Sequence, residues 1–214
     1  MSTTSEGILA NNIMHTVDSF FESAKAEKIH YDLHTAIRPS KNEKFAVYPY
    51  LHGKQHSKEQ LSFMSLCDVN TILLSQTATS TFSYYSSFNH NAHAFTVELG
   101  KVKPFGENEM SKFTPVMSAL SELLSNTILL LPTFRDCPLE IYTVNQVINK
   151  HYDDFKLHFT DDIANFTIFD KGQILASETN TQYKAEYDGE AIVFPNADVA
   201  IGQRAILTVI PYEI

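Results

Sequence analysis

The sequence changes character at Pro132, and this change most restricts the folds that the chain can adopt. After Pro132, short β-like runs follow one another, separated by turn signals such as Lys-Gly, Asp-Gly and Pro-Asn. Their spacing of roughly ten residues is typical of an all-β unit. The expected strands lie at 141–148, 155–159, 166–169, 174–176, 183–187, 191–194 and 205–210. We therefore expect a small all-β domain at 131–214.

Before Pro132, helical and strand-like segments alternate. Apolar residues spaced three and four apart predict helices at 7–26, 57–66 and 109–124. Short apolar runs predict strands at 28–33, 45–48, 70–75 and 94–99. The stretch 76–93 is dense in Ser, Thr, Tyr, Asn and His without a clear period, and we expect a long polar loop there, of a kind that tends to be functional. The alternation predicts an α/β domain at 1–130.

Charge and cysteine content exclude several classes of protein. The net charge is −9 and the basic residues are scattered, whereas nucleic-acid binding needs a clustered basic face. The opening residues have neither the basic nor the apolar region of a signal peptide, and no apolar run could span a bilayer. Cys67 and Cys137 lack metal-site spacing, as expected of inert thiols in a reducing compartment. We expect a cytoplasmic protein without nucleic-acid or membrane partners.

A first candidate site lies at the carboxyl end of the strand expected at 28–33. Asp32 and His34 should point to one side of that strand, with Leu33 on the other. A His at a strand end suits a metal ligand, and a carboxylate two residues earlier could orient its ring. The alternative is a solvated or hydrogen-bonded His, because zinc normally takes three protein ligands.

A second candidate is Glu98, at the end of the strand expected at 94–99. Alternation places it on the face opposite Phe95, Val97 and Leu99. Active sites of open α/β sheets lie at the carboxyl ends of strands, so Glu98 could be a general base. It could equally be a solvated charge at a strand end. Arg38 follows the His34 segment and could hold a substrate carboxylate with its two-pronged guanidinium.

Several segments together resemble the succinylglutamate desuccinylase/aspartoacylase family. They occur in the family's order, at compatible spacings, over essentially the whole chain. The segments are 32–38, 45–47, 97–101, 105–108, 191–196 and 200–205. The resemblance implies a partial zinc-carboxypeptidase-like α/β/α domain with a mixed sheet, followed by the small all-β domain.

The resemblance also implies a reaction and its residues. His34 matches a zinc ligand of the family and Glu98 its catalytic glutamate. The implied reaction is zinc-dependent hydrolysis of N-succinyl-L-glutamate to succinate and L-glutamate in arginine catabolism. Asp32, beside the metal ligand, and Arg38, as a substrate-binding residue, belong to the matching segment.

One departure from the family pattern limits this expectation. The family's other two zinc ligands come from a His-Gly-x-Glu segment upstream of the Asp-Leu-His strand. Here the His-Gly pair is His52-Gly53, downstream of His34, and Gln55 stands where the motif needs Glu. We therefore expect a fragment that is inactive alone and that could be completed by a missing N-terminal half. The alternatives are a non-catalytic remnant or interaction module, and a deacylase of another N-acyl amino acid such as N-acetylaspartate.

Overall fold

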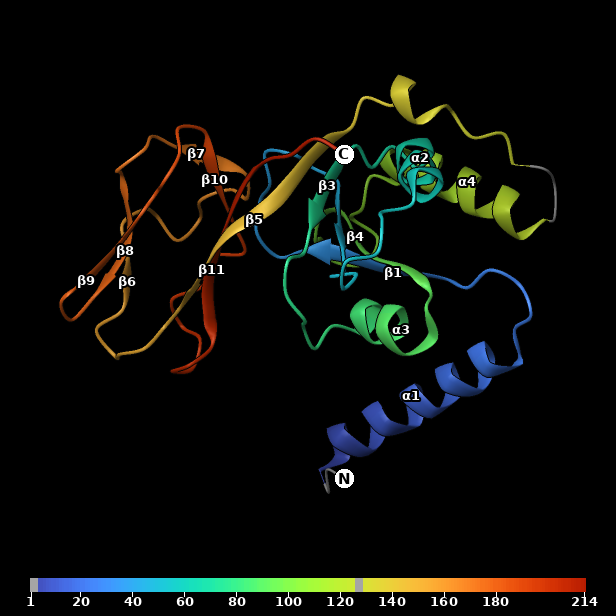
Figure 1. Cartoon of the computed structure of the whole chain (residues 1–214), viewed down its shortest axis with the longest axis horizontal. Helices are drawn as coiled ribbons and strands as arrows, with labels where there is room; N and C mark the ends of the chain where they lie inside the picture. Colours follow the sequence, from blue (N-terminus) through green and yellow to red (C-terminus); the bar gives the residue numbers. More distant parts are fainter. Residues whose placement is uncertain (1–3, 126–128) are drawn as a thin grey trace.

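A mixed sheet of eight strands runs through the molecule, shown in Figure 1 as a computed structural model that describes residues 4–125 and 129–214. The strand order is β1-β4-β2-β3-β5-β11-β10-β7. Its first half consists of β1 (Ile29–Ala36), β4 (His93–Lys101), β2 (Phe45–Tyr48) and β3 (Thr71–Leu74). Its second half consists of β5 (Glu140–Asn149), β11 (Arg204–Pro211), β10 (Glu190–Val193) and β7 (Thr167–Phe169).

Strand β5 joins the two halves of this sheet. Its first residues pair parallel with β3, with Thr71 opposite Glu140, and its later residues pair antiparallel with β11. The β unit therefore continues the sheet of the α/β unit. A second sheet, of β6 (Lys156–Leu157), β8 (Ile174–Glu178) and β9 (Thr181–Lys184), packs against β5 and β11 through a separate core.

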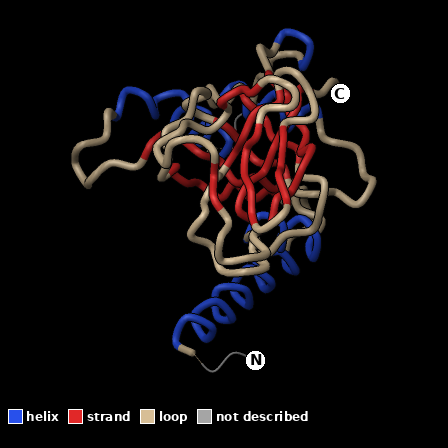
Figure 2. The backbone as a smooth tube through the Cα atoms, turned by 90° about the vertical axis from the view of Figure 1, so that its left-hand side faces the viewer, coloured by secondary structure: helices blue, strands red, loops and turns tan. Residues whose placement is uncertain are grey.

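Helices cover both faces of the α/β half, which gives three layers (Figures 1 and 2). On one face, α2 (Lys58–Leu66) and α4 (Thr114–Leu124) pack on the side chains of Phe95, Val97 and Leu99. Two short 3-10 turns, η1 (Met110–Phe113) and η2 (Phe134–Asp136), flank α4 in sequence. On the other face lies α3 (Phe82–His90), whose Ser83 hydroxyl is 2.8 Å from that of Thr96. The mixed α/β fold class is confirmed.

The prediction of a loop at 76–93 is wrong for half of these residues, because α3 occupies residues 82–90. Thr81 caps this helix by accepting a hydrogen bond from the Tyr84 N–H. The buried residues of α3 are Ser83, Ser86 and Ser87. Since its inner face is made of small hydroxyls, hydrophobic periodicity could not reveal it. The small side chains also let the helix lie close to β1 and β4.

Helix α1 (Ser5–Ser23) extends away from the rest of the fold (Figure 1). Phe21 is its one buried residue among those described. Asp18 attaches it to α3, accepting from the Tyr85 hydroxyl at 2.6 Å and lying 2.7 Å from His90 Nε2. Much of its apolar surface is exposed, including Ile8, Leu9, Ile13 and Phe20.

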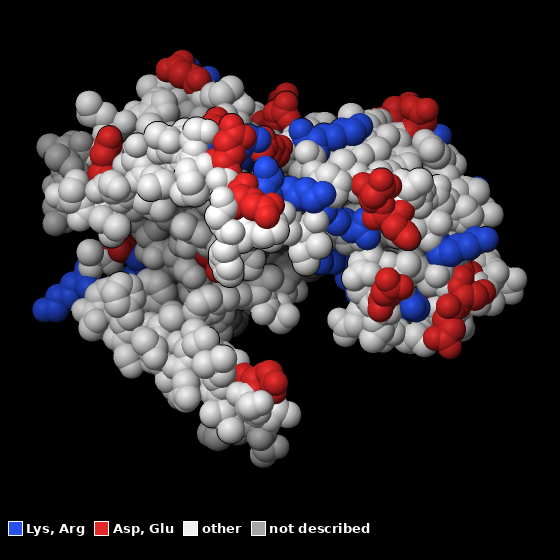
Figure 3. Space-filling model, turned by 180° about the vertical axis from the view of Figure 1, so that it is seen from behind, with Lys and Arg blue, Asp and Glu red and all other residues white. Residues whose placement is uncertain are grey.

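Acidic and basic side chains are interspersed on the face that Figure 3 shows, without a broad area of one sign. Helix α1 is nearly free of charge on this face. Of the helices within 4–125 and 129–214, none combines the length and apolar content that crossing a bilayer requires.

Candidate active site

Asp32, His34 and Glu98 lie on one face of the sheet, toward the carboxyl ends of β1 and β4. The two strands are parallel and His34 is directly opposite Glu98 in the register. Partners in register point to the same face, and so do residues two apart on one strand. Asp32 Oδ1 lies 3.1 Å from His34 Nε2. The strand runs on to Ala36, so His34 is inside β1 and not at its end as expected.

Glu98 is a buried carboxylate with an unsatisfied oxygen. It is 8% exposed, and its Oε2 has no hydrogen-bond partner among the described residues. Burial raises the pKa of Glu98, and the nearby Asp32 carboxylate raises it further. The positive potential of His34 lowers it, but the net pKa still lies above the ordinary value. A carboxylate that is poorly solvated when charged gains by accepting a proton. Glu98 is therefore suited to act as a general base.

His34 and Asp32 are more open to solvent than Glu98. Their side chains are 47% and 23% exposed. In the described parts of the chain, no group of three or more His, Cys, Asp or Glu is placed so that it could hold a metal ion. Zinc needs three protein ligands and a fourth position for water or substrate. These residues alone therefore do not fit a zinc site, although His34 could supply one ligand to a larger one.

Arg38 links the end of β1 to the β unit. Its Nη1 donates a hydrogen bond to the main-chain carbonyl of Asp161. The guanidinium keeps further N–H donors for a substrate carboxylate. Its substrate-binding role remains a prediction.

An aromatic wall of Phe45, Phe166 and Phe194 lies beside Glu98, and no pattern in the sequence predicts it. Phe45 is opposite Glu98 in the β2–β4 register and so lies on the same face. The ring centroids of Phe166 and Phe194, from the β unit, lie 5.2 and 5.8 Å from that of Phe45. Both have left-handed backbone, with φ of 61° and 54°. Their neighbour Asn165 accepts the Phe194 N–H and bonds to the main chain on either side of Ser40.

Left-handed backbone is unusual for a bulky residue and cannot be read from residue type. The segment 191–196 therefore predicts a core strand, while the turn of Phe194 toward Phe45 appears only in the structure. The β unit thereby packs against Phe45, the neighbour of Glu98 on β2.

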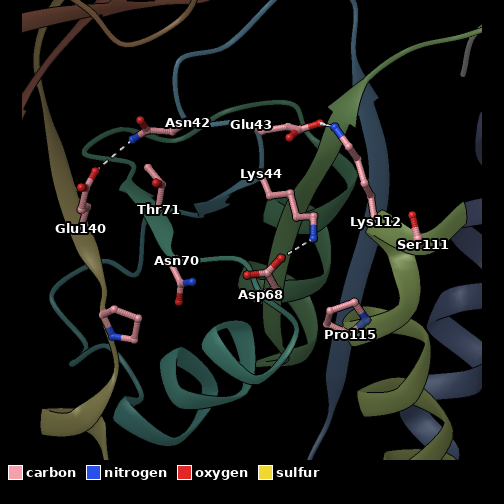
Figure 4. A pocket seen from close by; sticks show the side chains of 11 residues that line it. Asn42, Glu43, Lys44, Asp68, Asn70, Thr71, Ser111, Lys112, Pro115 and Glu140 are labelled. Carbon is pink, nitrogen blue, oxygen red and sulfur yellow. Dashed lines mark hydrogen bonds and ion pairs between the residues drawn. The ribbon is translucent and has the colours of Figure 1, made fainter. Parts of the chain in front are cut away.

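A polar cavity of about 400 Å³ lies elsewhere, beside α2 and η1 (Figure 4). Both of its lysines are already paired: Lys44 with Asp68 at 2.6 Å and Lys112 with Glu43 at 2.6 Å. Neither His34 nor Glu98 lines this cavity. It borders the helices on the face of β4 opposite Glu98. The cavity is therefore not part of the candidate active site.

Two family models match the chain in succession. The succinylglutamate desuccinylase/aspartoacylase catalytic domain matches residues 2–124, and the AstE/AspA barrel-sandwich hybrid domain matches residues 137–212. The chain belongs to the succinylglutamate desuccinylase/aspartoacylase family. The family resemblance expected from the sequence is confirmed, and with it kinship to hydrolases.

Curated members of the family are considerably longer than this chain. The succinylglutamate desuccinylase of Pseudoalteromonas atlantica is 60% identical over 204 residues, which cover 94% of this chain and 58% of the relative. That of Shewanella woodyi is 50% identical over 208 residues, covering 96% and 60%. The chain thus spans about three fifths of these relatives.

Solved family members share the fold. The succinylglutamate desuccinylase of Chromobacterium violaceum superposes with a TM-score of 0.86 at 39% identity, covering 99% of this chain and 63% of the other. That of Vibrio parahaemolyticus gives 0.90 at 36%, covering 100% and 62%. The zinc-carboxypeptidase-like architecture with an appended β unit, expected from the family resemblance, is confirmed.

Proposed function

We propose that this chain supplies the proton-transfer part of an active site that hydrolyses N-succinyl-L-glutamate to succinate and L-glutamate in arginine catabolism. The observation that carries the proposal is the buried Glu98 carboxylate, with one unsatisfied oxygen, opposite His34 on the neighbouring strand. The succinylglutamate desuccinylase names of relatives up to 60% identical support the substrate.

Glu98 moves one proton twice in this reaction. It accepts a proton from the water that attacks the succinyl carbonyl carbon, and a new C–O bond forms. It then gives the proton to the glutamate nitrogen as the C–N bond breaks, so that succinate and L-glutamate leave. Such transfer by a positioned carboxylate contributes about 10²–10⁴-fold to the rate. The raised pKa of Glu98 favours the accepting step.

His34 and Asp32 have supporting roles in the proposal. His34 is one ligand of a zinc site whose other ligands come from a His-Gly-x-Glu segment that this chain does not contain. Asp32, 3.1 Å from His34 Nε2, fixes the orientation of the ring. Arg38 holds a substrate carboxylate. The described residues do not make a complete site for the metal.

In this proposal a family segment that bears the His-Gly-x-Glu motif completes the site, and residues 1–214 by themselves do not turn over substrate. Among the described strands, β1 forms one edge of the large sheet and leaves its outer backbone groups unpaired. Apolar side chains are exposed at and beside its carboxyl end: Leu33 at 48%, Ile37 at 84% and Phe105 fully. A family segment that adds strands along β1 would cover these side chains and bring further ligands next to His34.

We also propose the division of labour along the chain. Residues 1–130 form the catalytic unit and residues 131–214 the β unit, which closes one side of the site through Phe166 and Phe194. The free thiols of Cys67 and Cys137 support a reducing compartment such as the cytoplasm.

The test is reconstitution. The chain is assayed for bound zinc and for succinylglutamate hydrolysis, alone and mixed with the part of the Pseudoalteromonas atlantica relative that this chain does not match, where we expect the His-Gly-x-Glu segment. We expect zinc and turnover in the mixture and neither in the chain alone. A mixture that forms a complex but shows neither would contradict the split active site.

Two other functions are separated by the same samples. A non-catalytic interaction module is favoured by the half-exposed His34 and the open edge of β1, and it predicts a complex without hydrolysis. A deacylase of another N-acyl amino acid predicts hydrolysis of N-acetylaspartate or other N-acyl substrates faster than of succinylglutamate. Comparing kcat/KM over a panel of N-acyl glutamates and aspartates decides between this deacylase and the proposed desuccinylase.

A further inference from the structure

A second cavity, of about 190 Å³, lies at the amino end of β4, away from Glu98 near the carboxyl end of the same strand. It is formed by the turn after β2, the end of α3 and the start of β4, and we call it the aromatic pocket. Its lining includes Tyr50, His52, Lys54, Phe88, Asn91 and His93. His93 begins β4 and Glu98 lies five residues further on, which is about 17 Å along a strand. An occupant of this pocket would therefore not reach the candidate active site.

Three rings make one wall of the aromatic pocket. The centroid of His52 lies 4.5 Å from that of Tyr50 and 5.0 Å from that of Phe88. His52 Nε2 is also 2.9 Å from the Tyr84 hydroxyl, which holds the imidazole in place. Phe88 is nonetheless 58% exposed. An ordered set of rings with an open apolar surface is suited to stack against a flat ligand.

Unusual backbone holds two of the lining residues. His52 has φ of 53° and is followed by Gly53 at 83°, and Asn91 has φ of 55° at the end of α3. For non-glycine residues this conformation costs free energy, and it persists where the surrounding structure enforces it. Both residues face one cavity from separate segments. Asn91 is the left-handed cap that ends α3 and His52 lies in a turn, so the local backbone fixes both side chains at the pocket.

The charged groups at the pocket favour a ligand of negative charge. Lys54 contributes an ammonium group, which donates one hydrogen bond to Asn91 Oδ1 and keeps two N–H donors. Among the described residues, no Asp or Glu lines the pocket. Glu27, just outside, is paired with His93 at 3.0 Å. The free charge facing the cavity is therefore positive, although the chain as a whole carries −9.

The volume of the aromatic pocket limits the size of the ligand that it can hold. A dry cavity of about 150 Å³ can hold a benzene ring, whereas pockets for drug-sized ligands start at about 300 Å³. At about 190 Å³ the aromatic pocket has room for one ring and a small substituent. We propose that the aromatic pocket is a binding site for a small aromatic carboxylate, with the ring stacked against His52 and Phe88 and the carboxylate at Lys54. This proposal does not depend on the hydrolytic function.

The test uses benzoate and the whole chain, followed by amide and aromatic NMR shifts. We expect saturable shifts at Ser87, Phe88 and Asn91, with a dissociation constant on the order of 1 mM for so small a ligand. Benzylammonium, with the same ring and opposite charge, should bind at least about tenfold more weakly because it meets Lys54. Equal binding of the two ions, or shifts that do not saturate at these residues, would overturn the proposal.

Single substitutions test the contributions of Phe88 and Lys54 to binding separately. Phe88→Ala should weaken benzoate at least about tenfold, whereas Phe105→Ala, which removes a more exposed ring outside the pocket, should have no effect. Lys54→Gln should weaken benzoate about fivefold and leave benzyl alcohol unchanged. All three positions are exposed, so the variants should keep the fold, and their spectra check this. If Phe88→Ala binds benzoate as the parent chain does, the site is not the aromatic pocket.

Discussion

His34 and Glu98 lie directly opposite each other on two parallel strands, and their side chains share one face of the sheet. They are 64 positions apart in sequence, and α2, β3 and α3 all lie between them. A parallel pair needs a crossover connection, and here the crossover also carries α3, which covers that face. The candidate site therefore depends on the β1–β4 register as much as on the residues themselves.

Asp32 is expected to act through His34. In the reconstituted protein, Asp32→Asn should lower zinc affinity by about 10–100-fold, because the ring loses the carboxylate that orients it. Zinc competition with a chelator measures this. Asp153→Asn, an exposed carboxylate in the β unit, serves as the control. Unchanged zinc affinity in Asp32→Asn would exclude this role.

Glu190 is expected to stabilise the junction of β5 and β10. It is 1% exposed and accepts hydrogen bonds from the side chains of Asn145 and Gln146 and from the main-chain N–H groups of Glu186 and Tyr187. Burial alone would raise its pKa, but these bonds and one from Thr208 outweigh it, and the net pKa is lowered. Glu190→Gln should cost about 2 kcal/mol of unfolding free energy at pH 7.

The pH dependence of this effect has a definite sign. A lowered folded-state pKa gives stability that is present above the ordinary value of 4.5 and is lost as pH falls through the folded-state pKa. The difference between the parent chain and Glu190→Gln in denaturant melts should therefore shrink below about pH 4.5. Glu213→Gln, at an exposed position, should behave as the parent at every pH. A difference that grows on acidification would contradict the assignment.

Asp18 is expected to hold α1 on α3. The Tyr85 hydroxyl and His90 both bond to it, and together they lower the pKa of Asp18. Asp18→Asn or Tyr85→Phe should speed amide hydrogen exchange throughout α1 and leave α2 unaffected. Tyr84→Phe removes a hydroxyl from the same helix without touching Asp18 and should not change α1. In the parent chain, α1 should lose protection as pH falls through the lowered pKa of Asp18.

The packing of α3 on the sheet is expected to depend on the small side chain of Ser86. It is fully buried, and its hydroxyl lies 2.8 Å from His30 Nδ1. Ser86→Ala should cost about 1 kcal/mol for the lost hydrogen bond, and Ser86→Leu about 3 kcal/mol because α3 must move away from the sheet. Ser80→Leu, on the exposed stretch before α3, is the matched control. Equal melting temperatures for both leucine variants would show that α3 does not pack as described.

Most of the elements could be predicted because their burial follows a simple period. Strand β2 matches its predicted bounds, and in β4 the alternation correctly separates Glu98 from Phe95, Val97 and Leu99. Helix α3 could not be predicted, since a buried face of serines has no apolar periodicity. The difference lies in what fills the interface, apolar side chains in one case and small hydroxyls in the other.

The candidate site could be predicted only in part, for a similar reason. Asp32 and His34 are two residues apart on one strand, so alternation was enough to place them together. Their position beside Glu98 depends on strand order, and the aromatic wall of Phe166 and Phe194 depends on left-handed backbone in the β unit. These are long-range features, and no short segment of the sequence specifies them.

The most direct test of the central claim is the activity of Glu98→Gln in the reconstituted protein. Gln keeps the size of the side chain and can no longer take up the proton. We expect succinylglutamate turnover to fall by about 10²–10⁴-fold with zinc content unchanged, and Glu107→Gln, at an exposed position, to retain parental turnover. Parental turnover in Glu98→Gln would contradict the assignment of Glu98 as the proton-transfer group.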